Sequence, residues 1–140
     1  MTISRHQINR TINQIDQEKK ENKKYPKNEA KALLSIAYLT KLNTKKLMNF
    51  KPEQFIVEKG KLKILAWGKN YKINKTDPLA QNIIELITPS FPERYIFTYF
   101  RKKTTIQVNG KTYTRYNKTY EYWLKKWFGC KHVTPKDLMK

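Results

Sequence analysis

Cysteine, glycine and acidic side chains are scarce in this chain. Its 140 residues include one Cys, four Gly and 11 Asp or Glu, against 30 Lys or Arg. Because Cys130 stands alone, an internal disulfide is excluded, which fits a reducing compartment. No apolar run approaches the ~20 residues of a membrane-spanning helix, and the N-terminus lacks a signal-peptide h-region. The sequence predicts a soluble, intracellular protein, either cytoplasmic or nucleoid-associated.

Groups of residues that could bind a metal or carry out catalysis are scarce as well. His6 and His132 lie far apart and have no companion Cys or carboxylate at metal-ligand spacing, so we expect neither a metal nor a cofactor. The acidic residues form no recognisable pair for acid–base catalysis, and there is no Gly-rich phosphate loop. Cys130 precedes Lys131 and His132, and a small residue after a helix stop is the favoured interpretation of this cysteine.

Positive charge and aromatic side chains are abundant. The net charge is +19, and the chain holds three Trp, nine Tyr and six Phe within a hydrophobic fraction of 39%. This content supports a folded core, and the length fits a single domain over residues 1–140. Within it we expect a basic N-terminal helix in residues 1–24 and a body over 25–140. Residues 1–60 hold 13 basic and 6 acidic side chains, and residues 61–140 hold 17 and 5.

The excess of positive charge favours nucleic acid as the partner, since a polyanion neutralises the self-repulsion of so small and basic a chain. Lysine (25) far outnumbers arginine (5), so a lysine coat on a solvated surface is the alternative. Charge alone does not separate duplex DNA from structured RNA.

Periodicity, capping and turn residues predict an α+β fold that is mainly helical, with a small three-stranded antiparallel sheet. Apolar residues recur at helical spacing in the helices, and glycine turns at Lys59-Gly60 and Gly68-Lys69-Asn70 separate the strands. The expected elements are a helix capped by Thr2 with the stripe Ile8, Ile12 and Ile15; a charged run at 18–24; a helix over about 29–42 capped by Asn28; a segment over 44–50 capped by Thr44; strands at 54–58, 61–67 and 71–74; and a helix from Asp77-Pro78 to Ile87, ended by Pro89 and Pro92.

The last third of the chain is rich in aromatic residues. Residues 94–100 fit a short strand or an extended stretch, and 107–112, with Asn109-Gly110, fit a loop or a hairpin tip. Residues 118–128 predict a helix with Tyr120, Trp123, Leu124 and Trp127 on one face, ended by Gly129. Thr134, Pro135 and Asp137 then match the N-cap, first and third positions of a helix.

Three strings, in this order, resemble the catalytic domain of tyrosine recombinases (phage integrases). Leu33–Phe50 is similar to the family segment Leu-Leu-x-x-x-Thr-Gly-Leu-Arg-x-Ser-Glu-Leu-x-x-Leu. Trp67-Gly68-Lys69 followed by Pro78-Leu79 is similar to the family's β-turn Gly-Lys and the Pro-Leu before its next helix. Thr134–Lys140 resembles the opening of the helix that carries Thr-Pro-His-Asp-Leu-Arg-His-Thr. The resemblance implies a tyrosine-recombinase-like fold.

Carried over position by position, the resemblance implies a degenerate active site. The family's first Arg falls on Asn43 and the acidic residue after it on Lys46, while the His and Arg of the late motif fall on Lys136 and Met139. Only the β-turn Lys is retained, as Lys69. The later His or Trp and the Tyr nucleophile would follow Lys140, so the motif is truncated. We therefore expect no enzyme activity, because the family's chemistry needs two Arg and an activated Tyr around the phosphate.

A DNA-binding surface is the main functional hypothesis, with these basic residues as its candidates: Lys41, Lys45, Lys46, Lys69, Lys72, Arg101, Lys102, Lys103, Arg115 and Lys136. For most of them a charged turn or a solvated helix face is the ordinary alternative. Tyr113 and Tyr116 alternate with basic residues and fit either nucleic-acid contact or ordinary loop aromatics.

The resemblance and the charge together predict a non-catalytic, recombinase-like protein that binds duplex DNA, as an accessory or regulatory factor of a mobile element or virus. Two alternatives stay open. The chain could bind or inhibit an active recombinase, or form a homodimer, through the groove that the missing family helices would cover. It could also be one piece of a split integrase. No membrane partner is expected.

Overall fold

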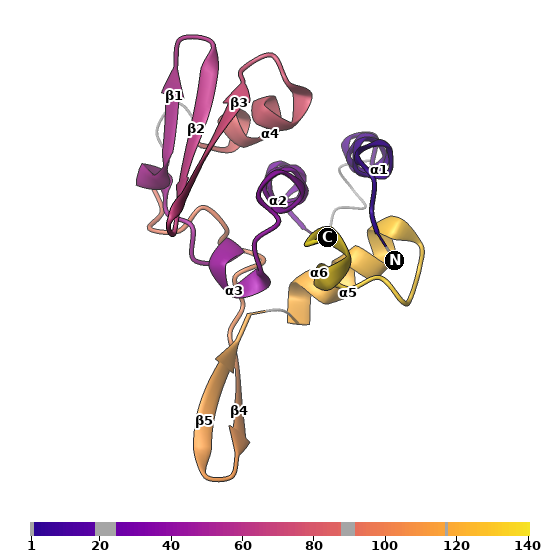
Figure 1. The fold of residues 1–140 in the computed structure, drawn as a ribbon. Helices are drawn as coiled ribbons and strands as arrows, with labels where there is room; N and C mark the ends of the chain where they lie inside the picture. Colours follow the sequence, from indigo (N-terminus) through magenta and orange to yellow (C-terminus); the bar gives the residue numbers. More distant parts are fainter. Residues whose placement is uncertain (1, 19–24, 88–91, 117) are drawn as a thin grey trace.

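The computed structural model describes residues 2–18, 25–87, 92–116 and 118–140, and within them the chain forms an α+β fold (Figure 1). The predicted α+β class with a small three-stranded antiparallel sheet is confirmed. Residues 19–24 of the predicted charged run, and Pro89, lie outside the described residues.

The elements are α1 (Arg5–Asp16), α2 (Lys27–Thr40), α3 (Thr44–Leu47), the 3₁₀ turn η2 (Pro52–Gln54), β1 (Phe55–Glu58), β2 (Lys61–Ala66), β3 (Lys69–Asn74), α4 (Pro78–Ile87), β4 (Thr104–Val108), β5 (Lys111–Arg115), α5 (Lys118–Phe128) and α6 (Pro135–Leu138).

Helix α1 begins with a reciprocal cap at Ser4. The Ser4 hydroxyl accepts from the Gln7 N–H at 3.2 Å, and the Gln7 side-chain oxygen accepts from the Ser4 N–H at 2.8 Å. The prediction that Thr2 caps this helix was wrong, because Ser-x-x-Gln satisfies two backbone donors where Thr2 would satisfy one. The predicted stripe of Ile8, Ile12 and Ile15 is buried.

Two further predicted caps were wrong by one or two residues. Helix α2 follows Pro26 directly and already includes Asn28, since the proline holds an extended backbone immediately before the first turn. Helix α3 is capped by Asn43, whose side-chain oxygen accepts from the Lys46 N–H at 2.9 Å. It ends at Leu47, whereas the prediction ran to residue 50.

Helix α2 is the centre of the core. It lies between the three-stranded sheet with α4 on one side and α1, α5 and α6 on the other (Figure 1). Leu33, Leu34 and Ile36 have no exposed surface, and one hydrophobic cluster extends from Ile3 to Leu138. Lys31, 8% exposed, pairs with Asp16 at 3.0 Å and lies 3.9 Å from Glu85, so α2 joins α1 to α4 through charge as well as packing.

The predicted meander is confirmed as a sheet of order β1-β2-β3, antiparallel throughout. Successive side chains of β2 point to opposite faces of the sheet, and Leu62 and Ile64 lie on the inner face, where both are fully buried. Tyr71 on the same face donates its hydroxyl to the Thr40 carbonyl at 2.9 Å, which fixes β3 to the end of α2.

The second turn of the meander differs from the prediction. Trp67 and Gly68 form the connection, and Lys69 is already paired with Ala66 as the first residue of β3. Gly68 has φ of +76°, which lets two residues close the turn without a third. Lys69 is thus on a strand end and not at a turn tip.

Residues 94–100 form neither a strand nor a helix; a buried carboxylate from α2 organises them instead. The two oxygens of Glu29, which is 4% exposed, accept hydrogen bonds from the N–H groups of Thr98, Tyr99 and Phe100 and from the Thr98 hydroxyl at 2.9–3.2 Å. Neither predicted alternative, a short strand or an extended stretch, is observed, because the chain bends at 94–96 and again at 98–100. The backbone donors that a strand would pair are satisfied by one side chain.

Helix α5 has the predicted bounds, and Gly129 ends it with φ of +61°. Tyr120, Leu124 and Trp127 are buried, and Trp123 is half-buried with its indole N–H 3.3 Å from the Tyr99 hydroxyl. Tyr25, next to Pro26, packs its ring 4.6 Å from Trp123 and 5.4 Å from Trp127, centroid to centroid. The start of α2 is therefore held against α5 by aromatic contacts.

Strands β4 and β5 form a separate two-stranded antiparallel hairpin, here called the arm (residues 104–115). Of the two predicted alternatives for 107–112, the hairpin tip is the observed one. Asn109 and Gly110 form the turn with φ of +52° and +77°, the signs that a tight Asn-Gly hairpin turn requires. The arm projects away from the body of the molecule (Figure 1).

Candidate nucleic-acid interface

A pocket of about 570 Å³ lies where α3, the end of β5, α5 and α6 meet. We call it the basic pocket. Its lining contains three basic side chains, one acidic side chain and several hydroxyl groups. The lining residues are Asn43, Thr44, Lys45, Thr114, Arg115, Tyr116, Glu121, Thr134, Pro135, Lys136 and Met139. Segments more than 90 residues apart in sequence thus share one site.

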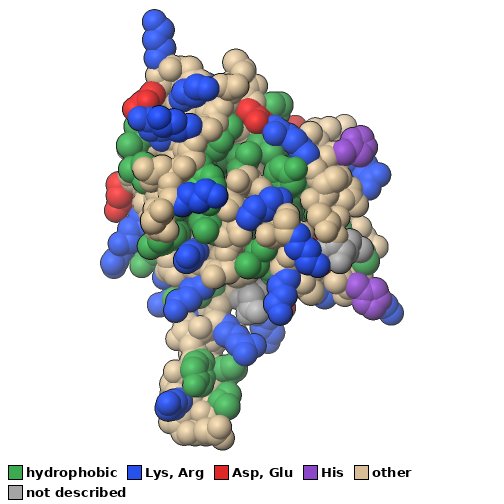
Figure 2. All heavy atoms as spheres, viewed as in Figure 1, with side chains coloured by type: hydrophobic (Ala, Val, Ile, Leu, Met, Phe, Trp, Pro, Cys, Tyr) green, Lys and Arg blue, Asp and Glu red, His purple; other side chains and the backbone are tan. Residues whose placement is uncertain are grey.

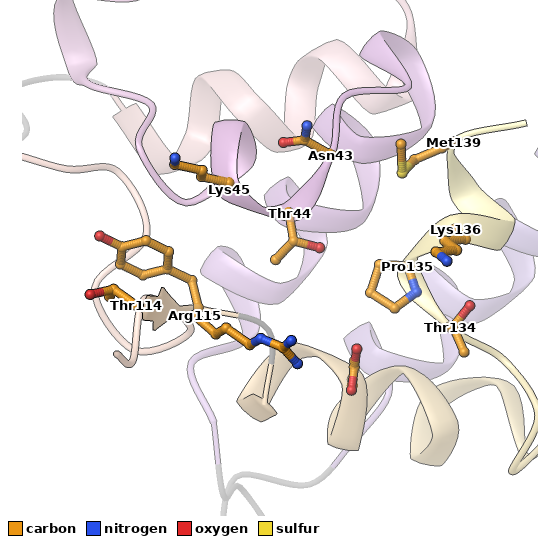
Figure 3. A pocket seen from close by; sticks show the side chains of 11 residues that line it. Asn43, Thr44, Lys45, Thr114, Arg115, Thr134, Pro135, Lys136 and Met139 are labelled. Carbon is orange, nitrogen blue, oxygen red and sulfur yellow. The ribbon is translucent and has the colours of Figure 1, made fainter. Parts of the chain in front are cut away.

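The basic side chains approach the pocket from different elements. Figure 3 shows Arg115 extending from the end of β5 beneath Thr44, with Lys45 on one side and Lys136 on the other. Lys45, Arg115 and Lys136 are all exposed, so their charges face solvent and are available to a ligand. With Glu121 as the one acid in the lining, cations outnumber anions by three to one.

The N-caps of α3 and α6 fix the positions of the pocket residues at its two ends. At one end, the Asn43 cap holds Thr44 and Lys45 in the first turn of α3. At the other, the Thr134 N–H donates to the Asp137 carboxylate at 2.9 Å, and this bond holds the pKa of Asp137 below its usual range although burial opposes it. The predicted helix start at Thr134-Pro135 is confirmed.

Arg101 connects the base of the arm to α3. Its guanidinium donates to the Met48 carbonyl at 2.9 Å and to the Asn49 side-chain oxygen at 3.1 Å. The same group lies 3.7 Å from the ring centroid of Tyr95 and 5.0 Å from that of Tyr116. These contacts give Arg101 a structural role. Its predicted contact with phosphate stays a prediction, and we leave it out of the interface proposed below.

Lys41 and Lys69 lie around the contact between β3 and the end of α2. Lys41 follows Thr40 with φ of +59° and places its ammonium 3.9 Å from the centroid of the Tyr38 ring. Burial lowers the pKa of Lys41. Lys69 lies over the Tyr71 ring at 5.0 Å, and Tyr71 in turn bonds to Thr40. Neither lysine lines the basic pocket, and both lie on the side of the sheet that faces α2.

The other predicted contacts are distributed over the surface. Lys72 is exposed on the outer face of the sheet, paired with Lys63 and away from Lys69. Lys46 is half-buried in α3, and Lys102 and Lys103 are exposed just before β4. Lys102 lies over the Tyr99 ring at 4.7 Å. The structure therefore brings Lys45, Arg115 and Lys136 together, whereas Lys72 lies on a different face.

Lysine and arginine side chains dominate one view of the molecule. In Figure 2 they are spread over the body and around the base of the arm, whereas the visible Asp and Glu side chains lie in the upper half. Three lining residues absent from the predicted set, Thr44, Thr114 and Thr134, add hydroxyl donors to the pocket. Thr44 and Thr134 were predicted only as helix caps, and no local signal brings them together with Thr114, since the three residues belong to α3, the start of α6 and β5.

The described residues contain no group of three or more His, Cys, Asp and Glu side chains able to hold a metal ion. Among the same residues, no helix combines the length and apolar character needed to cross a membrane. Comparisons with protein-family models, curated proteins and solved structures found no match to this chain. The resemblance to tyrosine recombinases therefore rests on the sequence strings alone.

Proposed function

We propose that this protein is a non-catalytic, recombinase-like DNA-binding protein that holds a backbone phosphate of duplex DNA at the basic pocket. One observation carries the proposal. Asn43, Lys136 and Met139, which the resemblance aligns with catalytic positions of tyrosine recombinases, line the same pocket although they are up to 96 residues apart. A chance resemblance in two distant strings would not require those residues to meet.

The charge of the pocket suits a phosphate. Lys45, Arg115 and Lys136 present ammonium and guanidinium groups, and the hydroxyls of Thr44, Thr114 and Thr134 offer further donors. Arginine binds phosphate through a planar fork and lysine as a point charge. Phosphate contacts of this kind position a duplex and carry no sequence information themselves, so we expect binding that depends steeply on salt.

The same residues favour binding over cleavage. Asn43 presents a neutral amide whose oxygen already caps α3, and Met139 presents an apolar thioether. Neither can neutralise the charge that develops on a phosphate during strand cleavage. A protein of this type would act as an accessory or regulatory factor, in keeping with an origin in a mobile element or virus.

The test is fluorescence anisotropy on a 20-base-pair duplex over a salt series. We expect K45Q/K136Q to weaken binding about tenfold at fixed salt and to make the slope of log affinity against log salt shallower by about 1.8, as loss of two phosphate contacts predicts. The matched control is K59Q/K61Q in and beside the β1–β2 turn, which removes the same charge at the top of Figure 1, away from α3 and α6.

The proposal fails if the wild-type protein does not bind duplex DNA at low salt, or if the pocket and control variants lose equal affinity. In either case the predicted interaction with another recombinase chain, or a homodimer, becomes the leading hypothesis, and size measurements in the presence of an active recombinase would follow.

A further inference from the structure

The arm is so exposed that burial in the core of the protein does not account for its hairpin structure. Every residue of β5 is exposed, as are three of the five residues of β4. A two-stranded hairpin by itself is at best marginally stable in water. Its sequence nevertheless favours this structure, with β-branched and aromatic residues in both strands and an Asn-Gly turn. These features indicate a structure that is kept for contact with a partner.

The charge of the arm and of the segments on either side of it limits which kinds of partner can bind there. From Arg94 to Tyr120 the sequence contains no acidic residue, while Glu93 and Glu121 flank this stretch. The basic residues within it are Arg94, Arg101, Lys102, Lys103, Lys111, Arg115 and Lys118. A segment with seven positive and no negative side chains repels a basic surface and attracts a polyanion.

The pairing register sorts the arm into two unlike faces. Ile106 opposes Tyr113, and Val108 opposes Lys111, so these four side chains share one face with Arg115. Val108 and Tyr113 are 48% and 49% exposed, so about half of each side chain faces solvent. The opposite face carries Thr105, Gln107, Thr112 and Thr114. Exposed apolar side chains and cations therefore occur together on a single face, here called the cationic apolar face.

We infer that the cationic apolar face lies in the major groove of duplex DNA, with Val108 and Tyr113 against base edges and Lys111 and Arg115 at the flanking phosphates. The groove is about 12 Å wide and admits a two-stranded ribbon, whose strands are about 4.8 Å apart. The thymine methyl group is the apolar feature that this groove exposes. Inside it, the Val108 side chain and the Tyr113 ring leave water, and the Tyr113 hydroxyl finds hydrogen-bond partners on the base edges.

This inference rests on the proposed function and makes it more specific. Arg115 belongs to both the arm and the basic pocket, so one duplex can contact the pocket through its backbone and the arm through its groove. The deep, narrow major groove of an A-form RNA duplex does not admit such a ribbon. A second copy of this chain is the other candidate occupant, and its net charge of +19 opposes that association.

The test uses a thymine-rich duplex and its uracil counterpart, which lacks only the thymine methyl groups. Two double variants of the full chain are compared by anisotropy: V108T/Y113T on the cationic apolar face and T105S/T112S on the opposite face. All four positions are in the paired strands and none lines the basic pocket. Circular dichroism first establishes that both variants fold like the wild type.

We expect V108T/Y113T to bind the thymine duplex about fivefold more weakly, and T105S/T112S to bind it within about twofold of the wild type. The wild type should prefer the thymine duplex to the uracil duplex by about threefold, less than a bidentate hydrogen-bonded base contact contributes, because only apolar methyl contacts differ. That preference should become smaller in V108T/Y113T, because the substitutions remove one methyl group at position 108 and the aromatic ring at position 113.

Two failures are distinguishable. If the wild type binds no duplex at low salt, the proposed function fails and the inference with it. If the wild type binds and K45Q/K136Q weakens binding, but V108T/Y113T matches the wild type on both duplexes, the proposed function stands and the groove contact is wrong. Equal affinity for an A-form RNA duplex would also overturn the groove contact. So would a protein dimer in the absence of DNA that V108T/Y113T dissociates.

Discussion

The body and the arm of this protein are stabilised in opposite ways. In the body, α1, α3 and α4 pack against α2, the aromatic face of α5 packs against Tyr25, and even charged groups such as Glu29 and Lys31 are buried with partners. In the arm, the backbone hydrogen bonds between the antiparallel strands β4 and β5 hold the structure together, and most side chains face solvent. The body therefore accounts for folding, while the arm and the pocket at its base are open to a ligand.

The largest expected effect comes from Glu29, which carries the connection between the body and the arm. E29A leaves the N–H groups of residues 98–100 without their acceptor in a buried site, and we expect a loss of about 4 kcal/mol in the free energy of unfolding. E29Q keeps one acceptor oxygen and should lose about half as much.

Chemical denaturation measures both values. The matched control is E53A, at an exposed carboxylate in η2, which should stay within about 0.5 kcal/mol of the wild type. Equal effects at the two positions would show that the buried carboxylate does not organise the 98–100 segment.

A matched pair of strand substitutions compares the two regions directly. I64T removes apolar surface at a fully buried position of β2 and buries a hydroxyl, so we expect a loss of about 3 kcal/mol. V108T makes the same kind of change on the exposed arm and should cost less than about 0.5 kcal/mol. Comparable losses in urea denaturation would mean that the arm folds as part of the core.

Tyr120 offers a stabilising change. It is fully buried, and its hydroxyl has no hydrogen-bond partner among the described residues. Burial correspondingly raises the pKa of this phenol. Y120F removes the unpaired group and should raise the free energy of unfolding by about 1 kcal/mol. Y113F, on the exposed arm, should leave it unchanged, and thermal melting of the two variants checks both expectations.

The smallest effect concerns the ion pair between Arg5 at the start of α1 and Asp77 before α4. Burial alone would raise the pKa of Asp77, but the Arg5 hydrogen bond and charge and the Leu79 N–H hold it below its usual value. The pair therefore stabilises the fold above about pH 4, the ordinary range of an Asp, and loses this contribution as pH falls through the lowered value.

Because Arg5 is substantially exposed, solvent screening limits the contribution to about 0.5 kcal/mol at pH 7. R5Q should show this loss at pH 7 in urea denaturation and should equal the wild type near pH 2. A difference between the two proteins that persists at pH 2 would mean that Arg5 acts through packing and not through charge.

Local rules predict the parts of the fold in which a residue's partners are near in sequence. The meander, the helix of residues 118–128 and the start at Thr134-Pro135 follow from periodicity, glycine turns and capping. The predicted N-caps at Thr2, Asn28 and Thr44 are misplaced by one or two residues. For α1 and α3 an adjacent polar residue, Ser4 or Asn43, accepts the N–H instead, whereas α2 starts after Pro26 with no side-chain cap. The bends at 94–100 depend on Glu29, about 70 residues away, and no local pattern reveals that partner.

The candidate site likewise contains residues that the sequence predicts and residues whose meeting only the folded structure reveals. The resemblance selects Asn43, Lys136 and Met139, and the structure places them in one pocket. Arg115 and Lys45 were predicted only as basic residues near aromatic or helical segments. The bonds from Arg101 to Met48 and Asn49, which span more than 50 residues, hold the base of the arm near α3, and Lys136 joins them from α6 in the same pocket. Such long-range contacts are set by the packing of the whole body.

The most direct test of the contrast between body and arm is amide hydrogen exchange with and without a 20-base-pair duplex at low salt. We expect the body to be protected in both states and the arm to exchange rapidly in the free protein. On addition of duplex, protection should appear at residues 104–115 and around the basic pocket, at 43–46 and 134–139. Unchanged exchange at both places, or protection confined to the outer face of the three-stranded sheet, would contradict the account.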